Sequence, residues 1–105
     1  MAGGVTSPNE KTKALLASLW ERNKPILLER LAVLNQAATA DPLPPELKAE
    51  AASVAHKLAG TLGMFGHMAA TRLAQELEAT LEAETPDRTR LSKLATELRR
   101  NLPQL

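Results

Sequence analysis

The chain has 105 residues, of which 13 are basic and 12 acidic, and it contains no cysteine. This length allows one small domain. The lack of cysteine excludes disulfides, thiolate metal sites and cysteine nucleophiles, and the balanced charge does not predict a nucleic-acid-binding protein. The apolar runs are too short to span a bilayer, and the N-terminus lacks the features of a secretory signal. We therefore expect a soluble, cytoplasmic protein.

Helix-forming residues dominate the composition. Alanine and leucine occupy 37 positions, whereas β-branched aliphatic residues occupy only four. Such a chain lacks the residues that fill a sheet core, and it predicts an all-α fold.

Residues 1–6 are predicted to be disordered, and residues 7–105 to form a single domain. The first helix is expected to begin at Ser7, with Pro8 in its first turn. Pro25 is expected to kink this long helix or to break it briefly. The apolar residues of this segment recur with helical spacing: Leu15, Leu16, Leu19, Trp20, Ile26, Leu27, Leu31, Leu34 and Ala38.

Three further helices are predicted after a rigid, proline-rich linker at 41–45. The second begins at Pro44 or Pro45 and runs to about Leu62, and a tight connection at 63–66 leads to the third. Thr85 is expected to cap the fourth helix, with Pro86 at its first position. The apolar stripes are Ala70, Leu73, Ala74, Leu77 and Leu81 in the third helix, and Leu91, Leu94, Ala95, Leu98 and Leu102 in the fourth. Amphipathic helices joined by short loops predict an antiparallel four-helix bundle.

His56 lies on the polar side of the predicted second helix. With about 100° per residue, the apolar stripe of this helix and His56 fall on roughly opposite sides. The residues three and four positions away share the face of His56, and all are small: Ala52, Ser53, Ala59 and Gly60. Gly60 costs about 1 kcal/mol relative to alanine inside a helix. This exposed imidazole with unobstructed surroundings predicts a docking site, although a surface histidine without function in an alanine-rich chain fits the same pattern.

The chemistry of a lone histidine narrows the functions that remain. A zinc site needs three or four ligands, and the chain has only one other histidine, His67, and no HxxxH or ExxH spacing. A hydrolase needs a pocket with a nucleophile, a base and an oxyanion hole, which an exposed helix face does not supply. Phosphoryl transfer with a partner that brings the pocket and the metal requires only an accessible imidazole nitrogen.

The segment from Ala55 to Gly66 resembles histidine-containing phosphotransfer (HPt) domains. The matching features are His56, Leu58, Gly60 and Gly66, and the 73–78 segment is similar to the next helix of the family. The resemblance implies a four-helix bundle and a phosphocarrier in which His56 accepts a phosphoryl group from a receiver-domain aspartate or a kinase and passes it to another aspartate. No ATP-binding motif is present, so we do not expect a stand-alone enzyme.

The supporting residues implied by the resemblance include one departure. The family usually has a lysine three residues after the histidine, where this chain has Ala59; Lys57 or the partner would then supply the positive charge. Glu78 is the candidate that braces the imidazole through Nδ1 and leaves Nε2 as the nucleophile, with Gln75 as the second choice.

The expected partners are a receiver domain of a response regulator, a hybrid histidine kinase, or both. We expect no cofactor and no metal in this chain, with Mg²⁺ in the receiver, and no nucleic acid or membrane as a partner. A monomer is expected because one chain completes four helices, whereas a dimerising, kinase-like bundle is a weaker alternative. Because position 59 lacks the lysine, a helical module that binds receivers without carrying phosphate also remains open.

The remaining unusual residues are given structural roles. Trp20, Met64 and Phe65 are expected in the core. His67 is expected to be a solvated residue at a helix start, and Arg99 and Arg100 to favour a helix C-terminus through the helix dipole.

Overall fold

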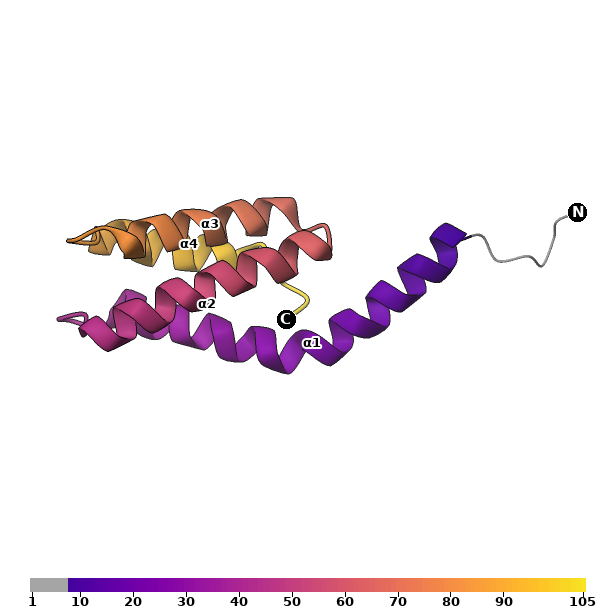
Figure 1. The fold of residues 1–105 in the computed structure, drawn as a ribbon, viewed down its shortest axis with the longest axis horizontal. Helices are drawn as coiled ribbons and strands as arrows, with labels where there is room; N and C mark the ends of the chain where they lie inside the picture. Colours follow the sequence, from indigo (N-terminus) through magenta and orange to yellow (C-terminus); the bar gives the residue numbers. More distant parts are fainter. Residues whose placement is uncertain (1–7) are drawn as a thin grey trace, which may run out of the picture.

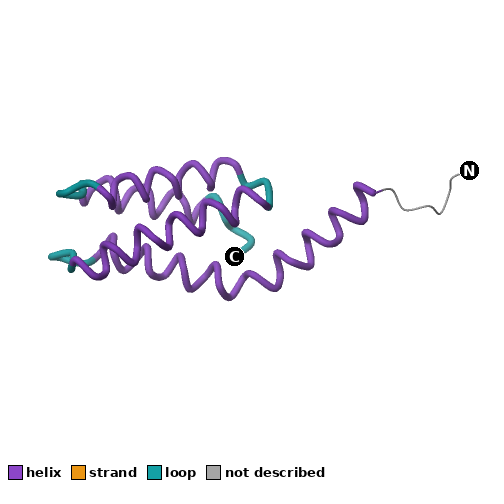
Figure 2. Tube along the Cα trace, in the orientation of Figure 1, coloured by secondary structure: helices purple, strands orange, loops and turns teal. Residues whose placement is uncertain are grey.

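The computed structural model describes residues 8–105, which form four helices. They are α1 (Pro8–Thr39), α2 (Pro45–Met64), α3 (Met68–Glu82) and α4 (Arg88–Arg100). Short loops join antiparallel neighbours, and the described residues include no strand (Figure 1, Figure 2). The predicted all-α, antiparallel four-helix bundle is therefore confirmed. The expected disorder of residues 1–6 and the expected cap at Ser7 lie outside the described residues.

The first helix is continuous through Pro25 but changes direction in its middle (Figure 1). Proline lacks the amide hydrogen and crowds the preceding turn, so a bend is its expected effect. The kink predicted at this residue is thus present, without a break in the helix. The half of α1 that precedes the bend points away from the other three helices (Figure 1).

Leucine side chains fill the core of the bundle. The largest fully buried ones come from all four helices and from the segment after α4: Leu27, Leu58, Leu62, Leu77, Leu81, Leu91, Leu98 and Leu102. The apolar stripes predicted for α2, α3 and α4 face this core. Leu15 and Ile26 of the predicted α1 stripe are exposed instead, because no other helix covers them.

Trp20 anchors the bend of α1 onto the end of the bundle. Its ring meets Phe65 edge-to-face at a centroid distance of 5.1 Å, and it stacks at a tilt on His67 at 4.6 Å. The core position expected for Trp20 is confirmed, and Phe65 packs half-buried against the core. The expectation for Met64 was wrong, since this side chain is exposed. His67 is also not simply solvated, because the indole covers one face of its ring.

The tight connection predicted between α2 and α3 is present, whereas the cap predicted for α4 is not. In the α2–α3 connection, Gly66 has φ = +81°, a conformation that favours glycine. The predicted cap at Thr85 is wrong: Asp87 caps α4, and its carboxylate accepts the Arg90 amide at 3.0 Å. Proline at 86 consequently lies before the helix rather than in its first turn. Arg99 and Arg100 occupy the last turn of α4, as expected.

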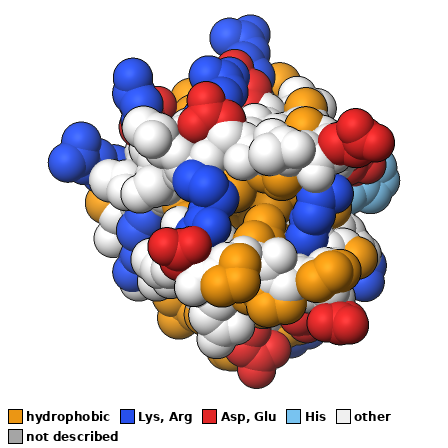
Figure 3. Space-filling model, turned by 90° about the vertical axis from the view of Figure 1, so that its left-hand side faces the viewer, with side chains coloured by type: hydrophobic (Ala, Val, Ile, Leu, Met, Phe, Trp, Pro, Cys, Tyr) orange, Lys and Arg blue, Asp and Glu red, His pale blue; other side chains and the backbone are white. Residues whose placement is uncertain are grey.

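Charged side chains of both signs are interspersed over the end of the bundle that carries the loops at 40–44 and 83–87 (Figure 3). Within residues 8–105, no helix is both long and apolar enough to cross a membrane.

Candidate functional site

The imidazole of His56 projects from the middle of α2 into solvent, with 75% of its side chain exposed. The reason is local: Ala55 and Leu58 on the same helix are completely buried, and the helical period turns His56 away from them. The outward position predicted from the sequence is what the structure has.

Glu78 of α3 holds the ring from the neighbouring helix. Its Oε2 lies 3.0 Å from Nδ1 of His56 and its Oε1 lies 3.3 Å from the same atom. The Glu78 side chain is only 23% exposed, so most of its surface is covered by the protein. Gln75, the second choice for this contact, is exposed on α3, and Glu78 makes the contact instead.

The contact with Glu78 determines the tautomer of His56. An ionised carboxylate only accepts hydrogen bonds, so Nδ1 must carry the proton and donate it to Glu78. In the neutral imidazole this leaves the lone pair on Nε2.

The surroundings of His56 are open toward the C-terminal side of α2. A Cβ added to Gly60 would have no atom within 4 Å apart from its own helix and chain neighbours, and both Gly60 and Ser53 are exposed. The space beside Gly60, on the same side of α2 as His56, is therefore open to an approaching partner.

Two of the predicted docking residues, Ala59 and Ala52, are more buried than Ser53 and Gly60. Ala59 is 7% exposed and is buried, so its inclusion was wrong. Ala52 is half-buried and packs against the core. The physical reason is that α3, which supplies Glu78, also covers the side of α2 that these two residues share, and the periodicity of α2 alone does not reveal its neighbour.

Lys57 supplies the positive charge next to His56, because the position three residues after the histidine is an alanine. Ala59 supplies no cation at the position where the family usually has a lysine. Lys57 is exposed next to His56. Sequence reasoning missed Arg30 of α1, whose Nη1 donates to Oγ1 of Thr61 at 3.2 Å and ties α1 to α2 at the residue that follows Gly60. No signal in the sequence pairs these two residues.

No metal centre is built into the described part of the chain. Among residues 8–105, no group of three or more histidine, cysteine, aspartate or glutamate side chains is placed to hold an ion.

Comparison with known proteins gives two matches. The family model described as "Hpt domain" matches residues 25–105, which cover the chain from Pro25 to its end. Protein RcaC of Microchaete diplosiphon is 40% identical over 68 residues, which are 62% of this chain and 10% of that protein. The match thus corresponds to about a tenth of the length of this relative. No solved structure gives a significant match.

Proposed function

Because this chain belongs to the Hpt domain family, it is a histidine phosphotransfer module of a phosphorelay, and we propose that Nε2 of His56 is the atom that carries the phosphoryl group. Hpt domains are phosphotransfer carriers rather than enzymes in their own right, and they work in two-component phosphorelays with receiver domains and kinases. The proposed donors and acceptors are accordingly receiver-domain aspartates, with a hybrid kinase as the source. We place the module in the cytoplasm as a monomer.

The observation that carries this proposal is the exposed imidazole whose Nδ1 is bonded to Glu78 at 3.0 Å. A nucleophilic nitrogen needs a free lone pair and a clear approach. Protonation of Nδ1 leaves the free lone pair on Nε2, and the open space at Gly60 gives a partner a clear approach.

In the proposed transfer, the Nε2 lone pair attacks the phosphorus of an aspartyl phosphate on the receiver. The N–P bond forms, the P–O bond to the aspartate breaks, and the aspartate leaves as a carboxylate. The ring becomes positively charged as the N–P bond forms, and Glu78 stabilises that charge through Nδ1–H. Return of the group to a second aspartate reverses these steps.

The remaining electrostatic support is assigned to Lys57 and to the partner. The transferred group carries negative charge on its oxygens, and positioning and charge neutralisation dominate such reactions. Position 59 offers no cation in this chain. We propose that the receiver supplies Mg²⁺ and that Lys57, adjacent to His56, assists from outside the helix. This chain itself needs no cofactor.

The test of the proposed function is a transfer assay with a radiolabelled, phosphorylated receiver. We expect acid-labile label on the wild-type chain, mapped to His56 by peptide analysis, and no label on His56→Gln, which keeps a similar size but has no imidazole. Circular dichroism checks that the variant folds. Label that persists on His56→Gln contradicts the assignment. A wild-type chain that binds the receiver but never acquires label supports the alternative of a silent interaction module.

The role of Glu78 as a positioning residue gives a separate prediction. Removing the carboxylate with Glu78→Ala should slow transfer by about tenfold without abolishing it, since a hydrogen bond to a charged group contributes about 1.5–3 kcal/mol and partial exposure weakens it. Nitrogen NMR of the imidazole should report a loss of the Nδ1–H tautomer.

The matched control for this prediction is Gln75→Ala, an exposed position on the same helix. We expect neither the tautomer nor the transfer rate to change in that variant. If Glu78→Ala lowers the rate while the tautomer stays as in the wild type, Glu78 acts through the packing of α3 rather than through Nδ1.

A further inference from the structure

The seam between α1 and α4 lies on the side of the bundle opposite the seam that carries His56. Among the described residues, α1 packs against α2 and α4, and α3 packs against the same two helices, so α1 and α3 are diagonal. The α2–α3 seam holds His56 and Glu78, and the α1–α4 seam is diametrically opposed to it. A partner docked on the α1–α4 seam therefore leaves the imidazole accessible.

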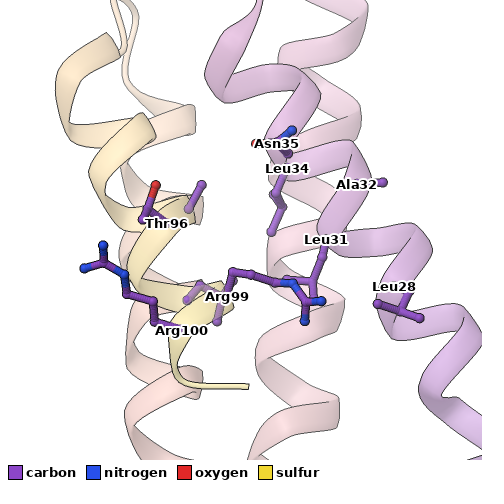
Figure 4. A pocket seen from close by; sticks show the side chains of 10 residues that line it. Leu28, Leu31, Ala32, Leu34, Asn35, Thr96, Arg99 and Arg100 are labelled. Atoms are coloured by element: carbon purple, nitrogen blue, oxygen red, sulfur yellow. The ribbon is translucent and has the colours of Figure 1, made fainter. Parts of the chain in front are cut away.

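An apolar groove of about 450 Å³ runs along this seam, and we call it the α1–α4 groove (Figure 4). Its floor is formed by Leu31 and Leu34 of α1 and Leu98 of α4, and Leu28, 42% exposed, forms its edge. The side chain of Arg99 reaches across from α4 to the side of Leu31, whereas Arg100 points outward from α4 (Figure 4). No carboxylate lines the groove.

The charge of α4 is strongly one-sided. The helix has five basic residues and one glutamate, which leaves eight basic and eleven acidic residues in the rest of the sequence. Two of these cations form ion pairs with carboxylates: Arg88 lies 3.7 Å from Asp41, and Arg90 lies 3.6 Å from Glu76.

The cations next to the groove are not neutralised. Arg99 donates only to the uncharged carbonyls of Leu102 and Leu105, at 3.3 and 3.5 Å. Arg100, which also lines the groove, has no hydrogen-bond or ion-pair partner among residues 8–105. The wall of the groove on α4 thus keeps net positive charge beside an apolar floor.

This combination indicates the shape and charge of the occupant. The lining of α1 extends from Leu28 to Asn35, a length of roughly 10 Å at 1.5 Å per residue. That length matches about two turns of a helix, whose apolar side chains at i, i+3, i+4 and i+7 fit a groove of this kind. A flat membrane does not enter a concave seam, and nucleic acid gains little from a leucine floor.

We propose that the α1–α4 groove binds an acidic amphipathic helix of a partner protein, with its leucine-type face on Leu28, Leu31 and Leu34 and its carboxylates against Arg99 and Arg100 of the α4 wall. Binding there holds the partner on this module while the opposite face exchanges phosphoryl groups, which raises the effective concentration of the partner at His56. The binding itself does not depend on phosphotransfer.

The probe is a synthetic, end-capped peptide of about 16 residues, with leucines at i, i+3, i+4 and i+7 and glutamates on the other face. It is titrated into the isotope-labelled full chain and followed by NMR. We expect shifts concentrated at residues 28–35 and 95–100, with the amides of His56 and Gly60 unaffected. A peptide with glutamine in place of glutamate should bind more weakly.

Two variants and one matched control make this test specific. Arg100→Glu should lower the affinity by at least about tenfold, because like charges across an interface are strongly unfavourable. Leu28→Ser should also lower it, since the edge of the apolar floor is lost. Arg72→Glu, the same charge reversal at an exposed position of α3, should leave the affinity unchanged.

Three outcomes would overturn the proposal. The first is no shift at the groove up to millimolar peptide, or shifts centred on the α2–α3 seam. The second is tighter binding of anionic lipid vesicles or of duplex DNA than of the peptide, with the same residues affected. The third is that the chain alone sediments as a dimer and that Leu28→Ser dissociates this dimer. That result would assign the groove to a second copy of the chain.

Discussion

Gly60→Glu is expected to reduce phosphoryl transfer at His56 by more than about a hundredfold without unfolding the protein. Gly60 lies four residues after His56 and therefore on the same side of α2. The space around its Cα is open, and in the proposed function an incoming receiver occupies that space. A glutamate fills that space and places negative charge beside an anionic phosphoryl group, and like charges in a docked interface cost several kcal/mol.

The fold should tolerate this change. Gly60 is exposed, and glutamate is a better helix former than glycine by up to about 1 kcal/mol. The measurement is the initial rate of transfer from a phosphorylated receiver, with circular dichroism and thermal unfolding as checks of the fold. Gly60 is a better position for this test than Ala52, because Ala52 packs partly against the core.

Two controls separate steric hindrance from other effects of the substitution. Gly60→Ala adds a methyl group that meets nothing within 4 Å, so transfer should be nearly unchanged. Ser92→Glu adds the same charge at an exposed position of α4, and we expect no effect on the rate. Transfer at the wild-type rate in Gly60→Glu would mean that receivers do not dock on this side of α2.

The largest effect on stability is expected from Leu58→Ala. Leu58 is completely buried, only two residues after His56, and its removal leaves a cavity at the centre of the bundle. Truncations of this kind cost about 2–5 kcal/mol, a large part of the 5–15 kcal/mol that is typical of a domain. Thermal unfolding should shift down by more than about 10 °C.

Leu15→Ala is the matched control, with the same chemical change at a residue that is 59% exposed in α1. Its free energy of unfolding should change by less than about 0.5 kcal/mol. Both values come from urea unfolding followed by far-UV circular dichroism. Equal losses in the two variants would show that the half of α1 before the bend is packed in solution.

The family match includes only the second half of α1. The matched region begins at Pro25, where the chain enters the bundle, and the residues before it are outside the match. Trp20 lies in this preceding part, yet it contacts Phe65 and His67 at the end of the bundle. The segment before Pro25 therefore contacts the bundle through this aromatic cluster.

Most of the fold was predictable because its signals are local. The apolar period, the proline near the start of α2 and the glycine at position 66 each act within a few residues, and they locate the helices to within one or two positions. The cap of α4 was misplaced because Thr85 and Asp87 are both acceptable caps on either side of Pro86, and the path of the chain decides between them.

The candidate site was predictable in part. The helical period gives the direction of His56 around the axis of α2, so its exposure could be predicted. Glu78 was selected through the resemblance to a family and not through periodicity, and the structure brings it to 3.0 Å from Nδ1. The contacts of Trp20 with His67 and of Arg30 with Thr61 have no pattern in the sequence that could have indicated them.

The sequence by itself determined which segments are helical and which way each side chain points from its own helix, because both depend on neighbours within one or two turns. Only the tertiary structure decided which neighbouring helix covers each face. Ala59 is buried and Gly60 is open although they are adjacent, since α3 packs against one side of α2 and leaves the other free. The α1–α4 groove has the same origin: the angle and offset between two helices are set by the packing of the whole core.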